Sequence, residues 1–272
     1  MATQLDQAGL LDTVLADVPL WVAGLGLALA CILASEVGRL VFRWLNRSPR
    51  ALELPDNFEG FLVGALFGLL AFVIGLTFSI AVERYEVRRG LVVEEANAIS
   101  AAYYRADFFD EPERTKLQDL LHRYTRLRVA PQGLWDEKAA ARIEQTQRLR
   151  GEIWRAARQA IMPVRDTERA SYFIDAVNGV VSVGTRRDFA GRSQIPRRLM
   201  EILMVYLLSS AAVLGFSMAA AGHGRRLTAT ALLVLTAGLI VIILDLDRSQ
   251  SGAISVSQRP ISELLVSLDN RL

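Results

Sequence analysis

Acidic residues close to a long apolar run are the residues of this 272-residue chain whose types and spacing best suit chemistry. Glu94 and Glu95, followed by Asn97, come about three helical turns after an apolar run that ends at Val82. If they face the axis of a symmetric oligomer, they form an acidic ring that attracts cations. If they face neighbouring helices, they pair with arginine, which is the more ordinary arrangement. The pattern leaves both alternatives open.

Metal and cofactor chemistry has little support in the remaining side chains. Asp245 and Asp247, after the last apolar run, suit a cation site, but interfacial pairing with Arg248 is the simpler interpretation. The single cysteine, Cys31, lies inside an apolar run and is expected to be a small buried residue. His122 borders an apolar stripe and is expected at the surface. Zinc-type ligand spacing is absent, so we expect no metal and no cofactor.

The charged residues inside or beside the apolar runs are better explained as ion pairs than as catalytic groups. Glu36 and Arg39 can pair with each other or extend toward the membrane surface, and Glu201 is expected to pair with Arg197 and Arg198. The chain has no nucleophile motif, phosphate-binding loop or paired-carboxylate site. We therefore expect no enzyme. The net charge of +2 gives no reason to expect nucleic-acid binding.

Four apolar runs are long enough to cross a bilayer as helices, which needs about 20 residues. Hydrophobic residues make up 52% of the chain, as in a multi-span membrane protein. The predicted spans are Pro19 to Phe42, Phe58 to Val82, Leu199 to Ala221 and Leu227 to Leu244.

Small residues recur on one face of the second span. Steps of three and four place them within about a third of the helix circumference. Such a face either packs closely against another helix or lines a narrow path. If it lines a path, its residues are pore-lining residues, and Glu94 and Glu95 continue that lining beyond the span. The face comprises Gly60, Gly64, Gly68, Ala71, Gly75 and Ser79.

The central region is predicted to be helical throughout. One helix starts near Asp110 and carries the apolar stripe Leu117, Leu120, Leu121, Tyr124 and Leu127; a second stops at Pro163 and a third covers about 167–181. The stripes indicate core packing between helices.

The predicted fold class is an all-α, four-span membrane protein with a helical domain inserted between spans two and three. Its parts are a membrane hairpin (1–82), the helical domain (83–198), a second hairpin (199–244) and a tail (245–272). Arginines near the membrane are more numerous beside the central region, which favours a cytoplasmic location for that region and both termini.

Three segments resemble the bestrophin family. IGLTFSIAVERYEVRR resembles its second-helix signature, SQIPRRLMEILMVYLL its Ile-Pro entry into the third span, and DLDRSQSGAISVSQRPISELLVSL its post-membrane turn and tail. VVEEANAI and LDRSQSGAISVSQRP are similar to runs of the bacterial bestrophin-like domain family. The residues that carry the first two matches are Gly75, Arg84, Tyr85, Arg88, Ile195, Pro196, Tyr206 and Leu207.

The resemblance implies a bestrophin-like, pentameric ion channel of the bacterial inner membrane. It also implies a central pore lined by the second helix and an apolar neck at Gly68, Phe72 and Leu76. Its partners are then the lipid bilayer, further copies of the chain and small inorganic ions. The calcium-binding acidic run of animal bestrophins is missing apart from Asp245 and Asp247.

A non-conducting membrane protein is the alternative: a scaffold or sensor whose helical domain binds a cytoplasmic partner. In that case the glycine face serves only helix packing. The position of Gly68, Phe72 and Leu76 separates the two hypotheses. Around a shared axis they favour a pore; buried within one subunit they favour the scaffold.

Overall fold

The longest element of the protein is α3, one unbroken helix over Phe58–Arg105. The computed structural model describes residues 19–46, 58–129, 137–221, 226–248 and 253–271, and within these ranges it contains helices and no strand. No proline interrupts the sequence of α3, so every residue in it has the backbone N–H that an intrahelical hydrogen bond needs. Two compact units share this helix: one holds its first part, to Val82, and the other its continuation from Glu83.

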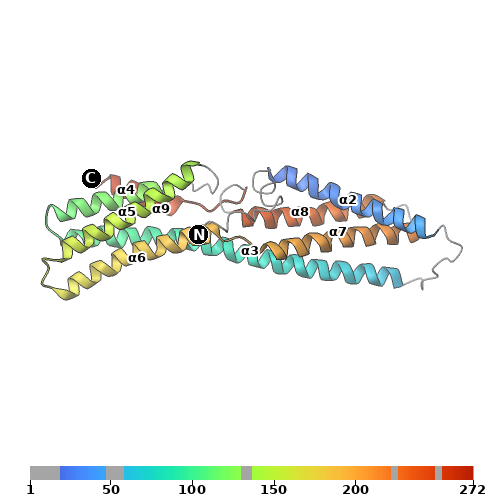
Figure 1. Ribbon diagram of the computed structural model, residues 1–272, viewed down its shortest axis with the longest axis horizontal. Coiled ribbons are helices and arrows are strands. Elements are labelled where there is room, and N and C mark those ends of the chain that lie inside the picture. Colours follow the sequence, from blue (N-terminus) through green and yellow to red (C-terminus); the bar gives the residue numbers. More distant parts are fainter. Residues whose placement is uncertain (1–18, 47–57, 130–136, 222–225, 249–252, 272) are drawn as a thin grey trace, which may run out of the picture. The chain divides into compact units, whose positions relative to one another are not determined.

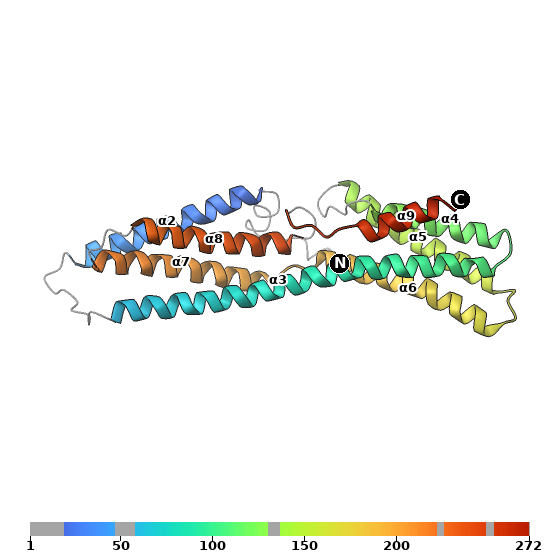
Figure 2. The same ribbon diagram turned by 180° about the vertical axis from the view of Figure 1, so that it is seen from behind.

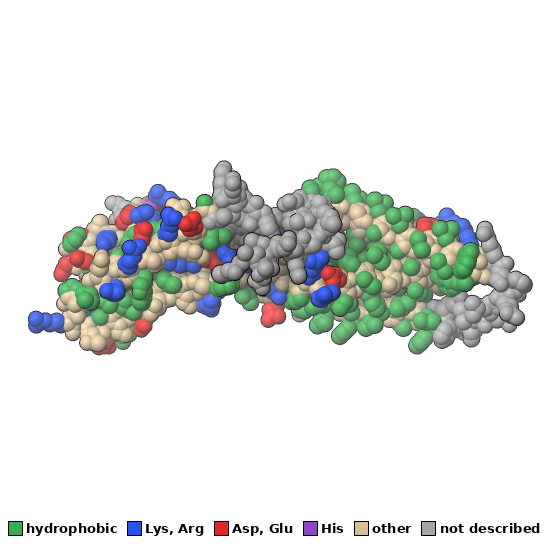
Figure 3. Space-filling model, in the orientation of Figure 1, with side chains coloured by type: hydrophobic (Ala, Val, Ile, Leu, Met, Phe, Trp, Pro, Cys, Tyr) green, Lys and Arg blue, Asp and Glu red, His purple; other side chains and the backbone are tan. Residues whose placement is uncertain are grey.

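The first unit, which we call the membrane unit, combines the start of α3 with three further helices. Four helices in the described part of the chain are long and apolar enough to cross a membrane, which confirms the four predicted spans. Apolar side chains cover much of the visible surface of this unit (Figure 3). Its other helices are α2 (Leu20–Leu45), α7 (Arg197–Ala220) and α8 (Arg226–Asp247), which Figures 1 and 2 show side by side.

Glycine brings the backbones of α2 and α7 into direct contact. A Cβ atom added at Gly38 would lie 1.9 Å from the carbonyl oxygen of Ala212, and one added at Gly215 would lie 1.9 Å from that of Ser35. Phe42 and Phe216 pack edge to face beside this crossing, with ring centroids 5.2 Å apart. This is small-residue packing of the kind membrane helices use, and it occurs at a helix pair that the sequence patterns did not single out.

The second unit, which we call the helical unit, contains the rest of α3 and the C-terminal segment. A capping residue explains where one of its helices begins. The carboxylate of Asp166 accepts the backbone N–H groups of Glu168 and Arg169, both at 3.1 Å, and so begins α6. The other elements are η1 (Ala106–Phe108), α4 (Glu113–Val129), α5 (Glu137–Ile161), α6 (Thr167–Arg192) and α9 (Arg259–Asp269).

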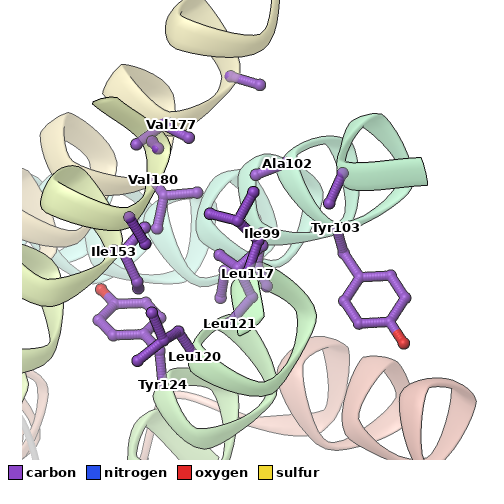
Figure 4. Packing of buried hydrophobic residues seen from close by; sticks show 14 of the residues in the cluster. Ile99, Ala102, Tyr103, Leu117, Leu120, Leu121, Tyr124, Ile153, Val177 and Val180 are labelled. Carbon is purple, nitrogen blue, oxygen red and sulfur yellow. The ribbon is translucent and has the colours of Figure 1, made fainter. Parts of the chain in front are cut away.

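The stripe predicted for α4 lies in the core of the helical unit. Leu117, Leu120, Leu121 and Tyr124 are buried, while Leu127 is partly buried at the edge. In Figure 4 the four buried α4 side chains lie near residues of the neighbouring helices, including Ile99 of α3, Ile153 of α5 and Val177 and Val180 of α6. The prediction of helix-to-helix core packing is confirmed. The third predicted helix, α6, runs eleven residues further than expected, from 181 to Arg192.

The C-terminal segment packs on the helical unit as the amphipathic helix α9. Its Ile261 and Leu268 are fully buried, and α9 contacts α4. The contact also corrects the prediction for His122, which is buried and not at the surface, because Asp269 of α9 covers it. Cys31 is buried, as predicted. The second histidine of the chain, His223, lies outside the described residues.

Candidate functional site: the exposed face of α3 and the Glu95 cluster

The small-residue face of α3 has no partner within the part of the chain that the structure describes. A Cβ atom added at Gly64, Gly68 or Gly75 would meet nothing within 4 Å. Phe72 is 66% exposed and Leu76 51% exposed, and Ser79 is exposed as well. These three glycines and Ser79, with Phe72 and Leu76 at their edge, therefore form a face that the described part of the subunit leaves open.

The buried face of the same segment lies roughly opposite. Leu70, Ile74, Thr77 and Ala81 are all buried, and at about 100° per residue they form one narrow stripe. Thr77 satisfies its hydroxyl by donating to the carbonyl oxygen of Val73 at 2.8 Å. This stripe is the intramolecular packing face of the span, so the glycines are not what holds α3 in its own subunit.

Glu94 and Glu95 point in different directions and have different partners. Glu94 is exposed, and its Oε2 accepts a hydrogen bond from Arg186 of α6 at 2.6 Å. Glu95 is fully buried. Consecutive helical positions differ by about 100°, which is enough to send one side chain outward and the other into the core. Both carboxylates are paired with arginine.

Glu95 lies at the centre of a buried polar network that we call the Glu95 cluster. Its carboxylate accepts the Tyr124 hydroxyl at 2.6 Å and Arg128 Nη2 at 3.0 Å, and it also pairs with Arg187. Arg128 Nη1 and Arg150 Nη1 in turn contact the carboxylate of Asp188 at 2.8 and 2.9 Å. The cluster comprises Glu95 of α3, Tyr124 and Arg128 of α4, Arg150 of α5, and Arg187 and Asp188 of α6.

The electrostatics of the cluster keep Glu95 ionised. Burial alone raises the pKa of a carboxyl group, but Arg128 and Arg187 outweigh it, and the pKa of Glu95 lies below its ordinary value. Burial and the negative Glu95 raise the pKa of Tyr124, so its hydroxyl stays protonated and donates. Three guanidinium groups and two carboxylates meet here, which ties α3 to α4, α5 and α6 by charge-assisted bonds.

The arginines of the second-helix signature make local contacts in the helical unit. Arg84 donates from Nη1 to the hydroxyl of Ser193. Arg88 is buried and donates from Nε to the carbonyl oxygen of Arg84 at 3.2 Å. Tyr85 is half-buried. These residues lie where the apolar span gives way to the polar continuation of α3, and their contacts fix that stretch locally.

The Ile-Pro pair begins α7. Pro196 is the N-terminal cap residue of the helix, and the buried Ile195 donates its backbone N–H to Asp247 Oδ1 of α8 at 2.9 Å. A proline suits this place because the first turn has no intrahelical acceptor for its N–H. One carboxylate that had suggested a cation site therefore holds the start of α7. Within the described ranges, no group of three or more His, Cys, Asp or Glu side chains could hold a metal.

The predicted ion pairs near the membrane segments are present. Arg39 Nη1 lies 2.6 Å from Glu36 Oε1, and Glu201 accepts from Arg197 Nε at 2.9 Å and from Arg198 Nη1 at 3.4 Å. Each pair joins residues three or four apart on one helix, which is the usual spacing of structural pairs.

Four apolar helices, two of them on either side of a helical insert, define a multi-pass, all-α membrane protein. The profile of the Bestrophin-like domain matches residues 28–261 of the chain. The chain belongs to the bestrophin-like domain family. Its fold and family are those of a bestrophin-type channel.

Solved structures of a bestrophin homologue from Klebsiella pneumoniae have the same fold. One variant of that protein superposes with a TM-score of 0.66 at 12% identity, over 89% of this chain and 96% of that one. A second variant gives 0.67 at 11% identity, over 91% and 98% of the two chains. A third gives 0.67 at 10% identity, over 90% and 97%. Among curated proteins, no sequence relative matches the chain.

Proposed function

We propose that this protein is a homo-oligomeric, pentameric ion channel of the bacterial inner membrane, with a pore lined by α3. The observation that carries the proposal is the open small-residue face of that helix. A Cβ atom added at Gly64, Gly68 or Gly75 would meet nothing in the described chain within 4 Å, and Phe72 and Leu76 beside them are exposed. A helix face that packs against nothing within its own subunit can line the symmetry axis of an oligomer.

The exposed side chains of α2 differ from those of α3, and the difference supports the assignment of α3 as the pore helix. It carries large aliphatic side chains, each more than half exposed, which suit contact with lipid tails. The exposed face of α3 also carries large side chains, among them Phe72 and Leu76, but glycine and serine lie beside them and leave room for water or close helices. The α2 residues are Leu25, Leu29, Leu33, Val37 and Leu40.

Gly68, Phe72 and Leu76 are the proposed neck. They are four residues apart, so in a symmetric oligomer each forms a ring one helical turn from the next. Rings of Phe72 and Leu76 would be apolar constrictions that gate by excluding water. Gly68 would leave the neck wider at its own level.

Beyond the span, α3 offers Glu94 as the proposed vestibule residue that meets ions. Glu95, the other proposed vestibule residue, is buried and paired with Arg187, so its contribution is to hold this part of α3 in place. We place the helical unit and both termini in the cytoplasm, because the arginines near the spans concentrate on that side.

Ion flux in liposomes tests the proposal. Purified protein should conduct small ions, and Phe72→Ala should increase the flux, because it removes the bulkiest ring of the neck. Phe78→Ala is the matched control: Phe78 is also exposed, but it lies about 120° around the same helix. It should leave the flux near the wild-type value.

Two results would overturn the proposal. One is the absence of flux for any small ion from folded oligomers, which would favour the scaffold or sensor. The other is an equal increase in ion flux from Phe72→Ala and Phe78→Ala, which would mean that the constriction is not formed by the face that carries Phe72. A symmetry determination in detergent tests the pentamer separately.

A further inference from the structure

One face of α7 is open from the first turn of the helix onward. Arg198, Ile202 and Val205 follow one another in steps of four and three, so they lie within about 60° around the helix. The Arg198 side chain is 91% exposed, and Ile202 and Val205 are 60% and 66% exposed. The side chains that α7 buries in its own subunit lie on roughly the opposite side, among them Leu203, Leu207 and Ser210.

The chemistry of this open face changes where the span begins. Ile202 and Val205 are branched aliphatic side chains, which suit contact with acyl chains. Arg198 comes one residue before the predicted span, which starts at Leu199. An arginine at the end of a span lays its methylene stem along the apolar surface and keeps its guanidinium among the lipid headgroups. The charge therefore lies about one helical turn from the aliphatic side chains, measured along the axis of α7.

The carboxylates at this end of the membrane unit leave Arg198 with a net positive charge. Glu201 is shared between two arginines: it accepts from Arg197 Nε at 2.9 Å and lies 3.4 Å from Arg198 Nη1. Asp245 is buried, and Asp247 accepts the backbone N–H that precedes α7. Two guanidinium groups thus share one carboxylate in the first turn of α7. The more exposed guanidinium, that of Arg198, is the one that faces outward above the aliphatic side chains.

We propose that this face of α7 binds an anionic phospholipid. The guanidinium of Arg198 binds the headgroup phosphate, since arginine and phosphate form charge-assisted, bidentate hydrogen bonds. An acyl chain of the same lipid lies against Ile202 and Val205. The aliphatic side chains commit the site to a lipid, because a free phosphate ion gains nothing from them. A zwitterionic lipid binds less tightly, because its choline cation repels the guanidinium.

Native mass spectrometry of the detergent-purified protein tests the site. Phosphatidylglycerol and phosphatidylcholine with identical acyl chains are titrated separately, and the dissociation constant of the first bound lipid is measured. Arg198→Gln should raise the constant for phosphatidylglycerol about fivefold, which is the contribution of one guanidinium near an anionic lipid surface. The constant for phosphatidylcholine should stay near its wild-type value.

A second variant and two further measurements serve as controls. Arg148→Gln removes the same charge from an exposed ion pair with Glu144 in the helical unit, and it should leave both lipid constants unchanged. Without added lipid, Arg198→Gln should melt at the wild-type temperature, because its contact with Glu201 is long and exposed. An excess of inorganic phosphate should not displace phosphatidylglycerol from the wild-type protein.

The proposal fails if Arg198→Gln leaves the constant for phosphatidylglycerol unchanged, or weakens both lipids equally. It also fails if inorganic phosphate displaces phosphatidylglycerol, since the site would then bind a free anion. Dissociation of the oligomer by Arg198→Gln would overturn it as well, because a second copy of the chain would then cover this face. None of these measurements requires ion conduction, so the lipid site and the channel are tested independently.

Discussion

Replacing Glu95 by glutamine should strongly destabilise the helical unit. The substitution keeps the shape of the side chain and removes its charge. Its carboxylate is fully buried and holds the Tyr124 hydroxyl and the guanidinium groups of Arg128 and Arg187. In the variant, three mostly buried guanidinium groups are left with Asp188 as the one carboxylate of the cluster.

The expected cost follows from that uncompensated charge. Removing one partner of a buried ion pair costs about 3–5 kcal/mol, because the remaining charge has lost both water and counter-charge. For a chain of this size that corresponds to a fall of about 10 °C in the midpoint of thermal unfolding. Glu94→Gln is the matched control. Glu94 and its partner Arg186 are both about half exposed, so the change should cost about 1 kcal/mol or less.

The pH dependence of the stability difference between wild type and Glu95→Gln gives a second readout. The pKa of Glu95 in the folded protein lies below its ordinary value of 4.5. The stabilisation is therefore fully present above that ordinary value and is lost as the pH falls through the folded pKa. The gap in melting temperature between wild type and Glu95→Gln should be largest near neutral pH and should shrink in acid.

Thermal unfolding of both variants in detergent, followed by circular dichroism across this pH range, is the assay. A loss of stability in Glu95→Gln no greater than in Glu94→Gln would refute the reasoning, since it would mean that Glu95 is solvated. A gap that does not shrink in acid would also contradict it.

Two further predictions concern the membrane unit. Gly38→Ala should lower the yield of folded protein and its melting temperature, because the new methyl group would lie 1.9 Å from the Ala212 carbonyl oxygen; Gly64→Ala, where nothing lies within 4 Å, should leave the fold of the subunit unchanged. Asp247→Ala should cost about 1 kcal/mol, since the Ile195 N–H loses its acceptor, and should increase hydrogen exchange at the start of α7 while the middle of that helix is unaffected.

Most of the fold could be predicted because it depends on local patterns. A span is a run of about 20 apolar residues, and a soluble helix shows its apolar stripe at steps of three and four. The Leu117–Tyr124 stripe and the end of α5 before Pro163 followed from these rules and are confirmed. The end of α6 did not, because the helix continues through Gly184 to Arg192.

The partners of polar residues could not be predicted in the same way. Glu94 and Glu95 are identical in type and adjacent in sequence, yet one is exposed and the other is buried. The arginines that pair with Glu95 come from 33 and 92 residues away, and local spacing does not encode such contacts. His122 was placed wrongly for the same reason: its partner, Asp269, is 147 residues further along the chain.

The sequence by itself determined that this is a four-span, all-helical membrane protein of the bestrophin-like kind, since length, hydropathy and short motifs are local properties. Tertiary structure decided which glycines pack and which lie open: Gly38 and Gly215 meet another backbone, whereas Gly64, Gly68 and Gly75 meet none. All five are small residues in apolar helices. Only the path of the neighbouring helix distinguishes a packing contact from a free face, and that path is set by the whole fold.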